Sequence, residues 1–323
     1  MDAKTVDPLK EAAIRAAGAW GLNAINVRSD LAISGSPQRS EFRCVAECAD
    51  HQLVVLENIR RQDCRKKQAI IDRLDFLSRR GLSCINPYLE TAEGSHIIQQ
   101  EDRFWQASPY IQGVALDRPA YALEEWRGAA MADFLINLRK ASLKLTESLS
   151  TSPFSILGYI DSLFSSMKLR EPVLVARLEP VKIFLRNRLA PIHGHLKAAF
   201  CHGDYHPLNI IWSGTGMKCV VDWEFSGAKP DSYDAALLIG CLGMETPDAL
   251  TGPLVMKFIH NLKAAHVLSG SSWRVLVEMI IAIRFGWLSE WLRNSDAEMI
   301  ELETVYMNLL MDHADILAAQ WHC

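Results

Sequence analysis

The residues best suited to do chemistry lie in one stretch, CHGDYHPLNIIWSGTGMKCVVDWE, which covers residues 201–224. Asp204 and Asn209 are five positions apart, and Asp222 follows Asn209 by thirteen positions. Their carboxylate and amide oxygens can accept a proton from a hydroxyl group or bind a divalent cation. The three side chains therefore indicate a site at which Asp204 lies beside a reacting oxygen while Asn209 and Asp222 meet at a metal ion.

Short elements must position these side chains. Pro207 fixes its own φ angle and helps to set the loop after Asp204. Residues 210–212 read as a short apolar strand, residues 213–216 as a turn rich in Gly and Ser, and residues 218–221 as a second strand that ends at Asp222. An apolar β-hairpin is thus expected to anchor both metal-binding side chains.

Protein kinases use the same order of residues: a catalytic-loop Asp, an Asn five residues later, and a second Asp after a β-hairpin. In that layout the first Asp faces the hydroxyl group of the substrate. The Asn and the second Asp hold Mg²⁺ on the phosphates of ATP. The stretch therefore predicts phosphoryl transfer that depends on ATP and Mg²⁺.

The segment HGDYHPLN followed by VVDWE resembles the aminoglycoside phosphotransferase and choline kinase superfamily, small-molecule kinases with a protein-kinase-like fold. The resemblance implies that Asp204 is the catalytic base, that Asn209 and Asp222 bind the metal, and that His202 braces the loop. It also places Asp234 where the superfamily has an acid that steadies the catalytic loop. Capping of a helix would explain an acid at that position about as well.

Composition limits the class of protein. The chain has 323 residues, of which 49% are hydrophobic, and a formal net charge of −4, which gives no reason to expect a nucleic-acid partner. No apolar run is long enough to span a membrane, and the start MDAKTVDPLKEAA does not read as a signal peptide. Eight cysteines without a C-x-x-C pair suit a reducing compartment. We expect a cytoplasmic protein with a small-molecule acceptor and no membrane partner; the oligomeric state is left open.

The N-terminal third reads as strands around a turn. Two β-like segments flank SGSPQRSEF, residues 34–42, and backbone N–H groups of such a turn can face phosphate oxygens. Ser36 and Arg39 are the residues of this turn that we expect to contact the nucleotide. A plain hairpin turn is the alternative, because the G-x-G-x-x-G spacing is absent.

A later strand leads to a candidate hinge. Residues 104–113 run from a strand into irregular chain, and in the superfamily the backbone of such a segment reads adenine. Residues 106–110 are the hinge candidate, with Gln106 and Tyr110 as nucleotide-binding residues. An edge strand that ends at Pro109 is equally consistent with the residues alone.

One position departs from the superfamily. Kinases of this shape usually carry a Lys near the end of the third strand, where this chain has Glu57. The helix that follows begins with several basic residues, so we expect a charge-swapped pair in which Glu57 meets Lys66 or Lys67 and that lysine reaches the phosphates. The alternative is that the basic residues form a solvated helix face.

The order of elements predicts the fold class. A β-rich first third is followed by helices, by the hairpin stretch and by further helices, which indicates a bilobal, protein-kinase-like α+β fold with the nucleotide between the lobes. We place the N-lobe at residues 1–108 and the C-lobe, with the catalytic and acceptor-binding residues, at 109–323. We also expect a strand pair at residues 87–90 and 95–98, and a loop at residues 226–230.

The acceptor is open between an amino alcohol, an amino acid, a sugar and an aminoglycoside. Acids and aromatic rings would suit a cationic acceptor, through charge and cation–π contacts. The candidate residues are Glu224, Asp234, Trp287 and Trp291. Trp287 and Trp291 share a helix face, and a place in the core explains both rings better than acceptor binding does. Arg284 and Arg293 would instead suit a carboxylate.

Three other classes of protein remain as alternatives. Glu57 is compatible with an inactive kinase-like regulator that binds nucleotide. His193, His195, His202 and His206 are compatible with a zinc hydrolase, although the kinase motif accounts for two of them. A protein kinase would need a longer segment between Asp222 and Asp234 to dock a protein substrate.

Overall fold

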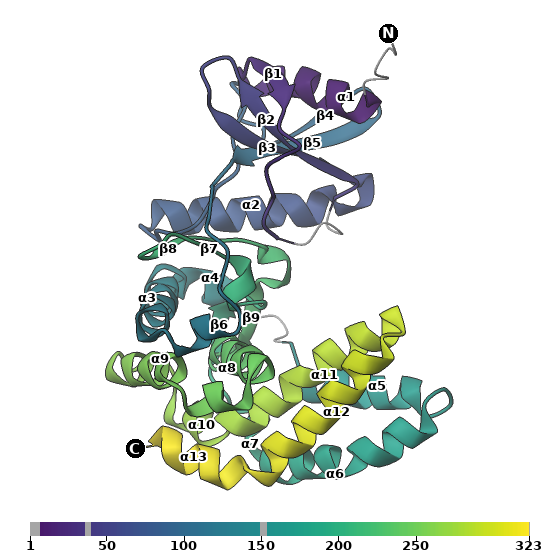
Figure 1. Cartoon of the computed structure of the whole chain (residues 1–323), viewed down its shortest axis with the longest axis vertical. Coiled ribbons are helices and arrows are strands. Elements are labelled where there is room, and N and C mark those ends of the chain that lie inside the picture. The colour runs from purple at the N-terminus through teal and green to yellow at the C-terminus, as the bar shows by residue number, and fades with distance from the viewer. Residues whose placement is uncertain (1–6, 36–39, 149–153, 323) are drawn as a thin grey trace. The chain divides into compact units, whose positions relative to one another are not determined.

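The structure is a computed structural model that describes residues 7–35, 40–148 and 154–322 of the chain. The chain divides into two compact units (Figure 1). The first comprises Met1–Ala115 and Leu208–Glu224, and the second comprises Leu116–Pro207 and Phe225–Cys323. The hairpin stretch that carries Asn209 and Asp222 therefore packs with the N-terminal part of the chain, although it lies far from it in sequence.

The first unit is built on a five-stranded antiparallel sheet with the strand order β1-β2-β3-β5-β4. Its strands are β1 (Ala24–Val27), β2 (Phe42–Cys48), β3 (Leu53–Ile59), β4 (Ile97–Gln100) and β5 (Arg103–Pro109). Its helices are α1 (Pro8–Ala17) and α2 (Cys64–Arg79). Helix α1 starts where expected, because Pro8 occupies the first turn and the Asp7 carboxylate accepts a hydrogen bond from the N–H of Leu9 at 3.0 Å.

Alternation along the strands separates an apolar face from a polar one. Successive side chains of a strand point to opposite faces of the sheet. One face packs on the alanines of α1, and the core there contains Ala12, Ala13, Ala16, Ala17, Cys44, Ala46, Cys48, Val54, Leu56, Trp105 and Ala107. The intervening residues of β2, β3 and β5, among them Arg43, Glu57 and Gln106, point to the other face.

The predicted hairpin is confirmed as β7 (Ile210–Trp212) and β8 (Met217–Val220). All residues of β7 are buried. The bonds that attach the hairpin to the rest of the first unit include those from Val114 N–H to Trp212 O at 2.9 Å, from Val220 N–H to Cys84 O at 2.8 Å, and from Lys218 Nζ to Gln112 O at 2.7 Å. These non-local contacts explain why the stretch joins the first unit.

The second unit is mainly helical. Its helices are α3 (Glu125–Ala141), α4 (Leu143–Ser148), α5 (Ile156–Met167), α6 (Pro172–Arg188), α7 (Ala190–His193), α8 (Tyr233–Glu245), α9 (Pro253–Ala264), α10 (Gly270–Arg274), α11 (Leu276–Asn294), α12 (Ala297–Asp312) and α13 (Ala314–His322). A two-stranded sheet pairs β6 (Ala198–Cys201) with β9 (Gly227–Pro230). Short 3₁₀ helices lie at Gly18–Trp20, Arg61–Asp63, Ala120–Leu123, Pro207–Asn209, Trp223–Phe225 and Pro247–Thr251.

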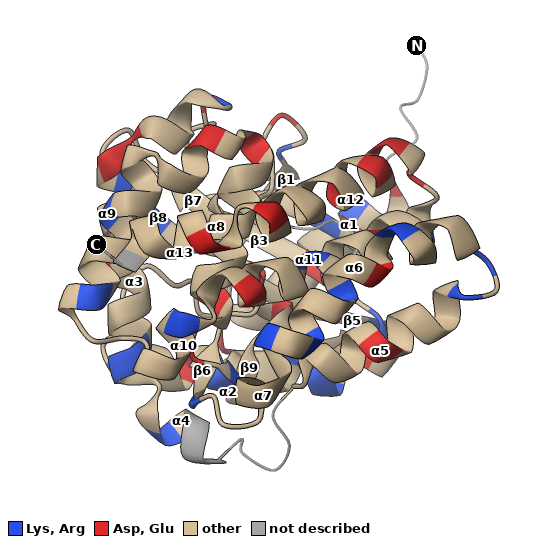
Figure 2. Cartoon of the chain, turned by 90° about the horizontal axis from the view of Figure 1, so that it is seen from below, with Lys and Arg blue, Asp and Glu red and all other residues tan. Residues whose placement is uncertain are grey.

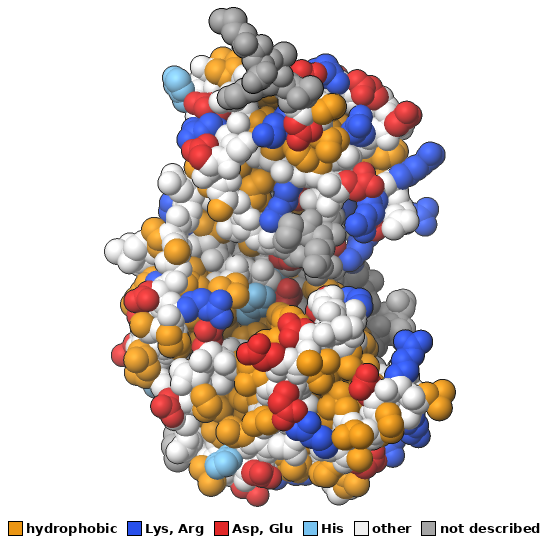
Figure 3. Space-filling view, turned by 45° about the vertical axis from the view of Figure 1, so that its right-hand side comes forward, with side chains coloured by type: hydrophobic (Ala, Val, Ile, Leu, Met, Phe, Trp, Pro, Cys, Tyr) orange, Lys and Arg blue, Asp and Glu red, His pale blue; other side chains and the backbone are white. Residues whose placement is uncertain are grey.

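Charge and hydropathy are ordinary over the described part of the chain. Lys and Arg are interspersed with Asp and Glu on the elements in view (Figures 2 and 3). None of the helices described here combines the length and the apolar character that crossing a membrane requires.

Two sequence-based expectations are wrong. Residues 87–90 form no strand; instead β4 pairs with β5 through a tight turn in which Glu101 takes a left-handed φ of 55°. Residues 226–230 are not a free loop, because Gly227–Pro230 forms β9 beside β6. Both errors have the same cause, since the partner strand that decides the pairing is not visible from local composition.

Gly128 is where α3 packs against α9, and a Cβ atom there would lie 2.1 Å from the carbonyl oxygen of Leu254. We predict that Gly128→Ala lowers the free energy of unfolding by about 1–3 kcal/mol, since the helices must separate to admit a methyl group. Urea unfolding would measure this. Gly286→Ala, also within a helix but with open space around its Cβ position, should instead raise stability slightly. Equal effects of the two changes would contradict this packing.

Candidate active site

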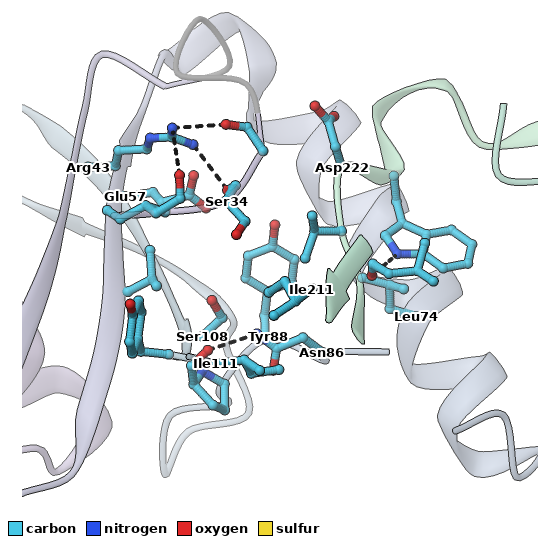
Figure 4. A pocket seen from close by; sticks show the side chains of 18 of the residues that line it. Ser34, Arg43, Glu57, Leu74, Asn86, Tyr88, Ser108, Ile111, Ile211 and Asp222 are labelled. Atoms are coloured by element: carbon cyan, nitrogen blue, oxygen red, sulfur yellow. Dashed lines mark hydrogen bonds between the residues drawn. The ribbon is translucent and has the colours of Figure 1, made fainter. Parts of the chain in front are cut away.

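A pocket that is partly open to solvent lies within the first unit on the polar face of the sheet (Figure 4). Apolar side chains form much of its wall: Ile33, Val55, Ile70, Leu74, Ile111, Ile211 and Val220. Charged and polar side chains complete it: Ser34, Arg43, Glu57, Lys67, Asn86, Ser108, Asp222 and Glu224. Apolar walls with charged groups suit a flat ring that carries phosphates.

Within the described part of the chain Glu57 forms no ion pair with a lysine, so the expected pairing of Glu57 with Lys66 or Lys67 is wrong. The carboxylate of Glu57 accepts a hydrogen bond from Gln106 Nε2 at 2.7 Å. The two residues are direct partners in the β3–β5 register, and Arg43 is the partner of Glu57 on the other side, in β2. The strand register therefore places Glu57 beside residues of the sheet, Arg43 and Gln106, and not beside the lysines of α2.

Both lysines of α2 pair with Glu224 instead. Lys67 forms an ion pair with Glu224, and Lys66 Nζ lies 2.9 Å from the second carboxylate oxygen. The side chains of Lys67 and Glu224 are only 6% and 7% exposed. Burial alone would raise the pKa of Glu224, but Lys67 and Lys66 outweigh burial and hold that pKa below its usual value. The pair ties α2 to the segment directly after Asp222.

Asn209 and Asp222 are brought together by the hairpin. The N–H of Val221 donates to the backbone carbonyl of Asn209 at 2.9 Å, which aligns the start of β7 with the end of β8. Asp222 lines the pocket and has a left-handed φ of 65°. An amide oxygen and a carboxylate are the hard oxygen ligands that Mg²⁺ prefers, so this donor set fits the expected metal.

Arg43 holds a loop above this end of the pocket. Its guanidinium donates to the carbonyls of Ile33, Ser34 and Gly35 at 3.2, 3.4 and 2.9 Å (Figure 4). Gly35 has a φ of +86°, and its Cβ position lies 4.0 Å from the side chain of Asp222. Ser36 and Arg39, which we expected to contact the nucleotide, lie outside the described residues.

Residues 106–110, the hinge candidate, form several hydrogen bonds with the rest of the first unit. Gln106 is fully buried and bonded to Glu57. Asn86 Nδ2 donates to the carbonyl of Pro109 at 2.8 Å, and the N–H of Tyr110 donates to Leu53 O at 3.0 Å. Tyr110 lines the pocket, whereas Gln106 is held within the sheet.

The loop that carries Asp204 belongs to the second unit and is fixed by Asp234. The Asp234 carboxylate accepts the N–H groups of His202 and Gly203 at 2.7 and 2.8 Å. Gly203 has a φ of +86°, and a Cβ atom there would lie 2.2 Å from the carbonyl oxygen of Phe225, so only glycine fits. Burial raises the pKa of Asp234 against the lowering effect of those two donors.

Asp204 is flanked by two histidines. Its N–H donates to His202 Nδ1 at 3.2 Å, and His206 Nε2 lies 3.6 Å from one carboxylate oxygen. His202 is fully buried and His206 is nearly so. For Asp234 the geometry favours a role in holding this loop over a role in acceptor binding. Both of its carboxylate oxygens already accept backbone N–H groups, those of His202 and Gly203.

The two tryptophans of α11 lie near this loop. Trp287 packs edge-on against His206 at 5.9 Å between ring centroids, and it stacks on Trp291 at the same separation. Both rings are half-buried. Arg284, which the sequence made a candidate for binding a carboxylate, is instead buried in an ion pair with Glu303. The structure thus brings Trp287 close to Asp204, while Glu224 lies in the other unit.

The comparisons with known proteins agree with this arrangement. The model of a family described as the phosphotransferase enzyme family matches residues 53–265. The chain belongs to this family. The predicted superfamily and the predicted enzyme class, a phosphotransferase, are thereby confirmed.

Solved structures share the fold of this phosphotransferase at low sequence identity. A microcompartment-associated aminopropanol kinase has a TM-score of 0.69 at 13% identity, with 95% of this chain and 98% of that chain covered. An amicoumacin kinase, solved with AMP-PNP, Ca²⁺ and amicoumacin, has a TM-score of 0.62 at 13% identity, with 94% and 93% covered. Choline kinase LicA from Streptococcus pneumoniae has a TM-score of 0.58 at 16% identity, with 97% and 99% covered. No curated protein matches the sequence. The likeness confirms the kinase-like α+β fold.

Among the residues of the phosphotransferase pocket that sequence reasoning missed are Arg43 and Tyr88. Tyr88 lies in the pocket beside Ile211 (Figure 4). Burial raises the pKa of its hydroxyl, and the nearby carboxylates add to this effect. Arg43 could have been found from strand alternation, because it lies two positions before the buried Val45 on β2. Tyr88 has no such signal, since residues 87–90 have no regular structure.

We predict that Glu224→Gln lowers the free energy of unfolding by about 3 kcal/mol at pH 7, because it leaves Lys67 buried without a carboxylate. The lowered pKa of Glu224 sets the sign of the pH dependence. Its stabilising effect is complete above the ordinary carboxyl pKa and is lost as the pH falls through the native pKa. The difference between wild type and variant should therefore shrink in acid. Glu101→Gln, at an exposed pair, is the control; a matching loss there would contradict the account.

Proposed function

We propose that this chain is an ATP- and Mg²⁺-dependent kinase that transfers the γ-phosphoryl group to a hydroxyl group of a small molecule. The observation that carries the proposal is the backbone bond from Val221 N–H to Asn209 O, which brings Asn209 to the end of the hairpin where the next residue, Asp222, lines the pocket. Oxygen donors beside an apolar pocket suit a nucleotide whose phosphates carry a divalent cation.

The nucleotide assignment is supported by the contents of the pocket. Ile33, Val55 and Ile211 offer apolar contacts for a base, and Arg43 offers a positive charge that no carboxylate pairs with among the described residues. The amicoumacin kinase with a similar fold was solved with AMP-PNP and Ca²⁺, an ATP analogue and a divalent cation. We infer that ATP occupies this pocket. We assign Asn209 and Asp222 to Mg²⁺, which when bound neutralises charge on the phosphates.

In the proposed reaction Asp204 orients the acceptor hydroxyl and takes its proton. His206 beside its carboxylate and Asp234 beneath its loop hold it in position. His202 braces the same loop by accepting the N–H of Asp204. Positioning and electrostatics supply most of the rate in such a transfer, because little covalent chemistry is required of the protein.

The acceptor class is an amino alcohol, amino acid, sugar or aminoglycoside. Trp287 and Trp291 lie on the side of Asp204 that His206 occupies, so they are our candidates for acceptor contacts. Arg284 offers no site for a carboxylate, because Glu303 already neutralises it. Amino alcohols therefore come first in the panel, and the similar aminopropanol and choline kinases support that order.

The alternative of an inactive nucleotide-binding regulator rests on Glu57 alone. Nothing in the comparisons supports it, and Asp204, Asn209 and Asp222 are all present. The zinc hydrolase has no support either: among the described residues no three His, Cys, Asp or Glu side chains are grouped to hold a metal.

We predict that Asp204→Asn lowers turnover by about 10²- to 10⁴-fold and leaves ATP binding unchanged, since a base acts only on the acceptor. ADP release from Mg-ATP with a panel of amino alcohols, amino acids, sugars and aminoglycosides measures turnover, and calorimetry measures binding. Asp312→Asn, at the exposed end of α12, is the matched control. A variant as active as wild type would refute the assignment of the base.

We also predict that Asp222→Asn removes most of the strengthening of ATP binding by Mg²⁺. The amide is neutral and is a poorer ligand for a hard cation than the carboxylate it replaces. Titrations of ATP with and without MgCl₂ measure the effect. Asp50→Asn, in an exposed turn of the same unit, should retain the Mg²⁺ dependence. If Asp222→Asn also retained it, the metal would be held elsewhere.

A further inference from the structure

The pocket of the first unit contains two cationic side chains in different electrostatic situations. Lys67 is paired with the Glu224 carboxylate and is almost completely buried. Arg43 donates its hydrogen bonds to three neutral backbone carbonyls, those of Ile33, Ser34 and Gly35. Among the described residues no carboxylate lies within ion-pair distance of Arg43. Its charge is therefore the one in the pocket that a bound anion would compensate.

The position of Arg43 in the sheet is specific. Arg43 on β2 and Glu57 on β3 are direct cross-strand partners. Direct partners in an antiparallel pair point to the same face, with Cβ atoms about 5 Å apart. A cation on β2 thus lies beside the place on β3 where a lysine would be expected. Glu57 is satisfied by the amide of Gln106, so it does not need Arg43 as a partner.

The loop bound by Arg43 leads towards the metal-binding carboxylate. Arg43 Nη2 donates to the carbonyl of Gly35 at 2.9 Å, and the Cβ position of Gly35 lies 4.0 Å from the Asp222 side chain. Figure 4 shows Arg43 and Asp222 on opposite sides of the upper part of the pocket. Burial lowers the pKa of Arg43, while Glu57 and Asp222 act in the opposite direction. Arg43 is thus a partly desolvated cation within electrostatic reach of the metal-binding end.

We propose that Arg43 binds the phosphates of the nucleotide and so supplies from β2 the positive charge that β3 lacks at Glu57. The inference rests on the proposed function, because it requires that a nucleotide occupies the pocket. A guanidinium suits this role, since its donors are arranged in a rigid fork that matches phosphate oxygens. The simpler alternative is that Arg43 only holds the loop at Ile33–Gly35.

Nucleotide binding by Arg43→Gln separates these two roles. Glutamine keeps an amide donor for the loop carbonyls but loses the charge. Calorimetric titration with ATP, ADP and adenosine should give an ATP affinity about 10- to 100-fold weaker than that of wild type, ADP weakened as well, and adenosine within about twofold. Arg43→Lys, which keeps the charge, should retain more of the ATP affinity. Arg103→Gln, on β5 and outside the pocket, should bind all three ligands normally.

A relocated charge gives a second test. In the double variant Arg43→Gln/Glu57→Lys the cation moves to the facing position on β3. If the pocket needs a positive charge at this place, the double variant should recover at least about tenfold in ATP affinity over Arg43→Gln. If Arg43 only held the loop, Glu57→Lys would not restore the ATP affinity that Arg43→Gln had lost. Circular dichroism would verify that each variant is folded.

The outcomes are distinguishable. Weaker ATP binding with adenosine unchanged, and recovery in the double variant, would support the inference. Equal weakening of ATP and adenosine would mean that Arg43 only shapes the loop, and unchanged ATP affinity would mean that it does not touch the phosphates; either result overturns the inference while leaving the proposed function in place. If wild type bound neither ATP nor adenosine, the proposed function itself would fail, and the inference with it.

Discussion

The buried ion pair between Lys67 and Glu224 is the constraint on which the pocket depends. Taking two charges out of water costs several kcal/mol each, so such a pair persists only where geometry and further charges compensate. Here Lys66 adds a second positive charge to the same carboxylate. The pair joins α2 to the residues directly after Asp222. Trp223 lies between Asp222 and Glu224 in the sequence, and its side chain is buried. It fixes the same segment, because its Nε1–H donates to Val220 O at 3.0 Å. The position of Asp222 therefore follows from a contact of side chains far apart in the chain.

Strand alternation provides the second level of organisation in the first unit. The apolar residues of β2, β3 and β5 face the alanines of α1, and the same pleat turns Arg43 and Glu57 towards the pocket. A shift of one residue in register would exchange the two sets. The apolar core beneath α1 thus also determines which charged side chains face the pocket. Glu57 and Arg43 are direct cross-strand partners there.

The sequence was informative where function requires side chains at fixed local spacing. Asp204, Asn209 and Asp222 lie in one short stretch, and their spacing predicts the hairpin, the enzyme class and the kinase-like fold. It was less informative where strands from different parts of the chain meet. The partner of Glu57, the role of Arg43 and the pairing of Gly227–Pro230 with β6 depend on register, which local composition does not encode. The Lys67–Glu224 pair joins residues 157 positions apart and has no local signal either.

The central claim is that the γ-phosphoryl group of ATP passes to a hydroxyl group of a small molecule. Phosphorus-31 NMR of wild-type protein with Mg-ATP and the amino alcohols of the panel would follow that group directly. The account predicts that the γ-phosphate resonance is replaced by that of a phosphomonoester of one acceptor, together with ADP. Conversion of ATP to ADP and inorganic phosphate alone, whichever acceptor is present, would contradict it.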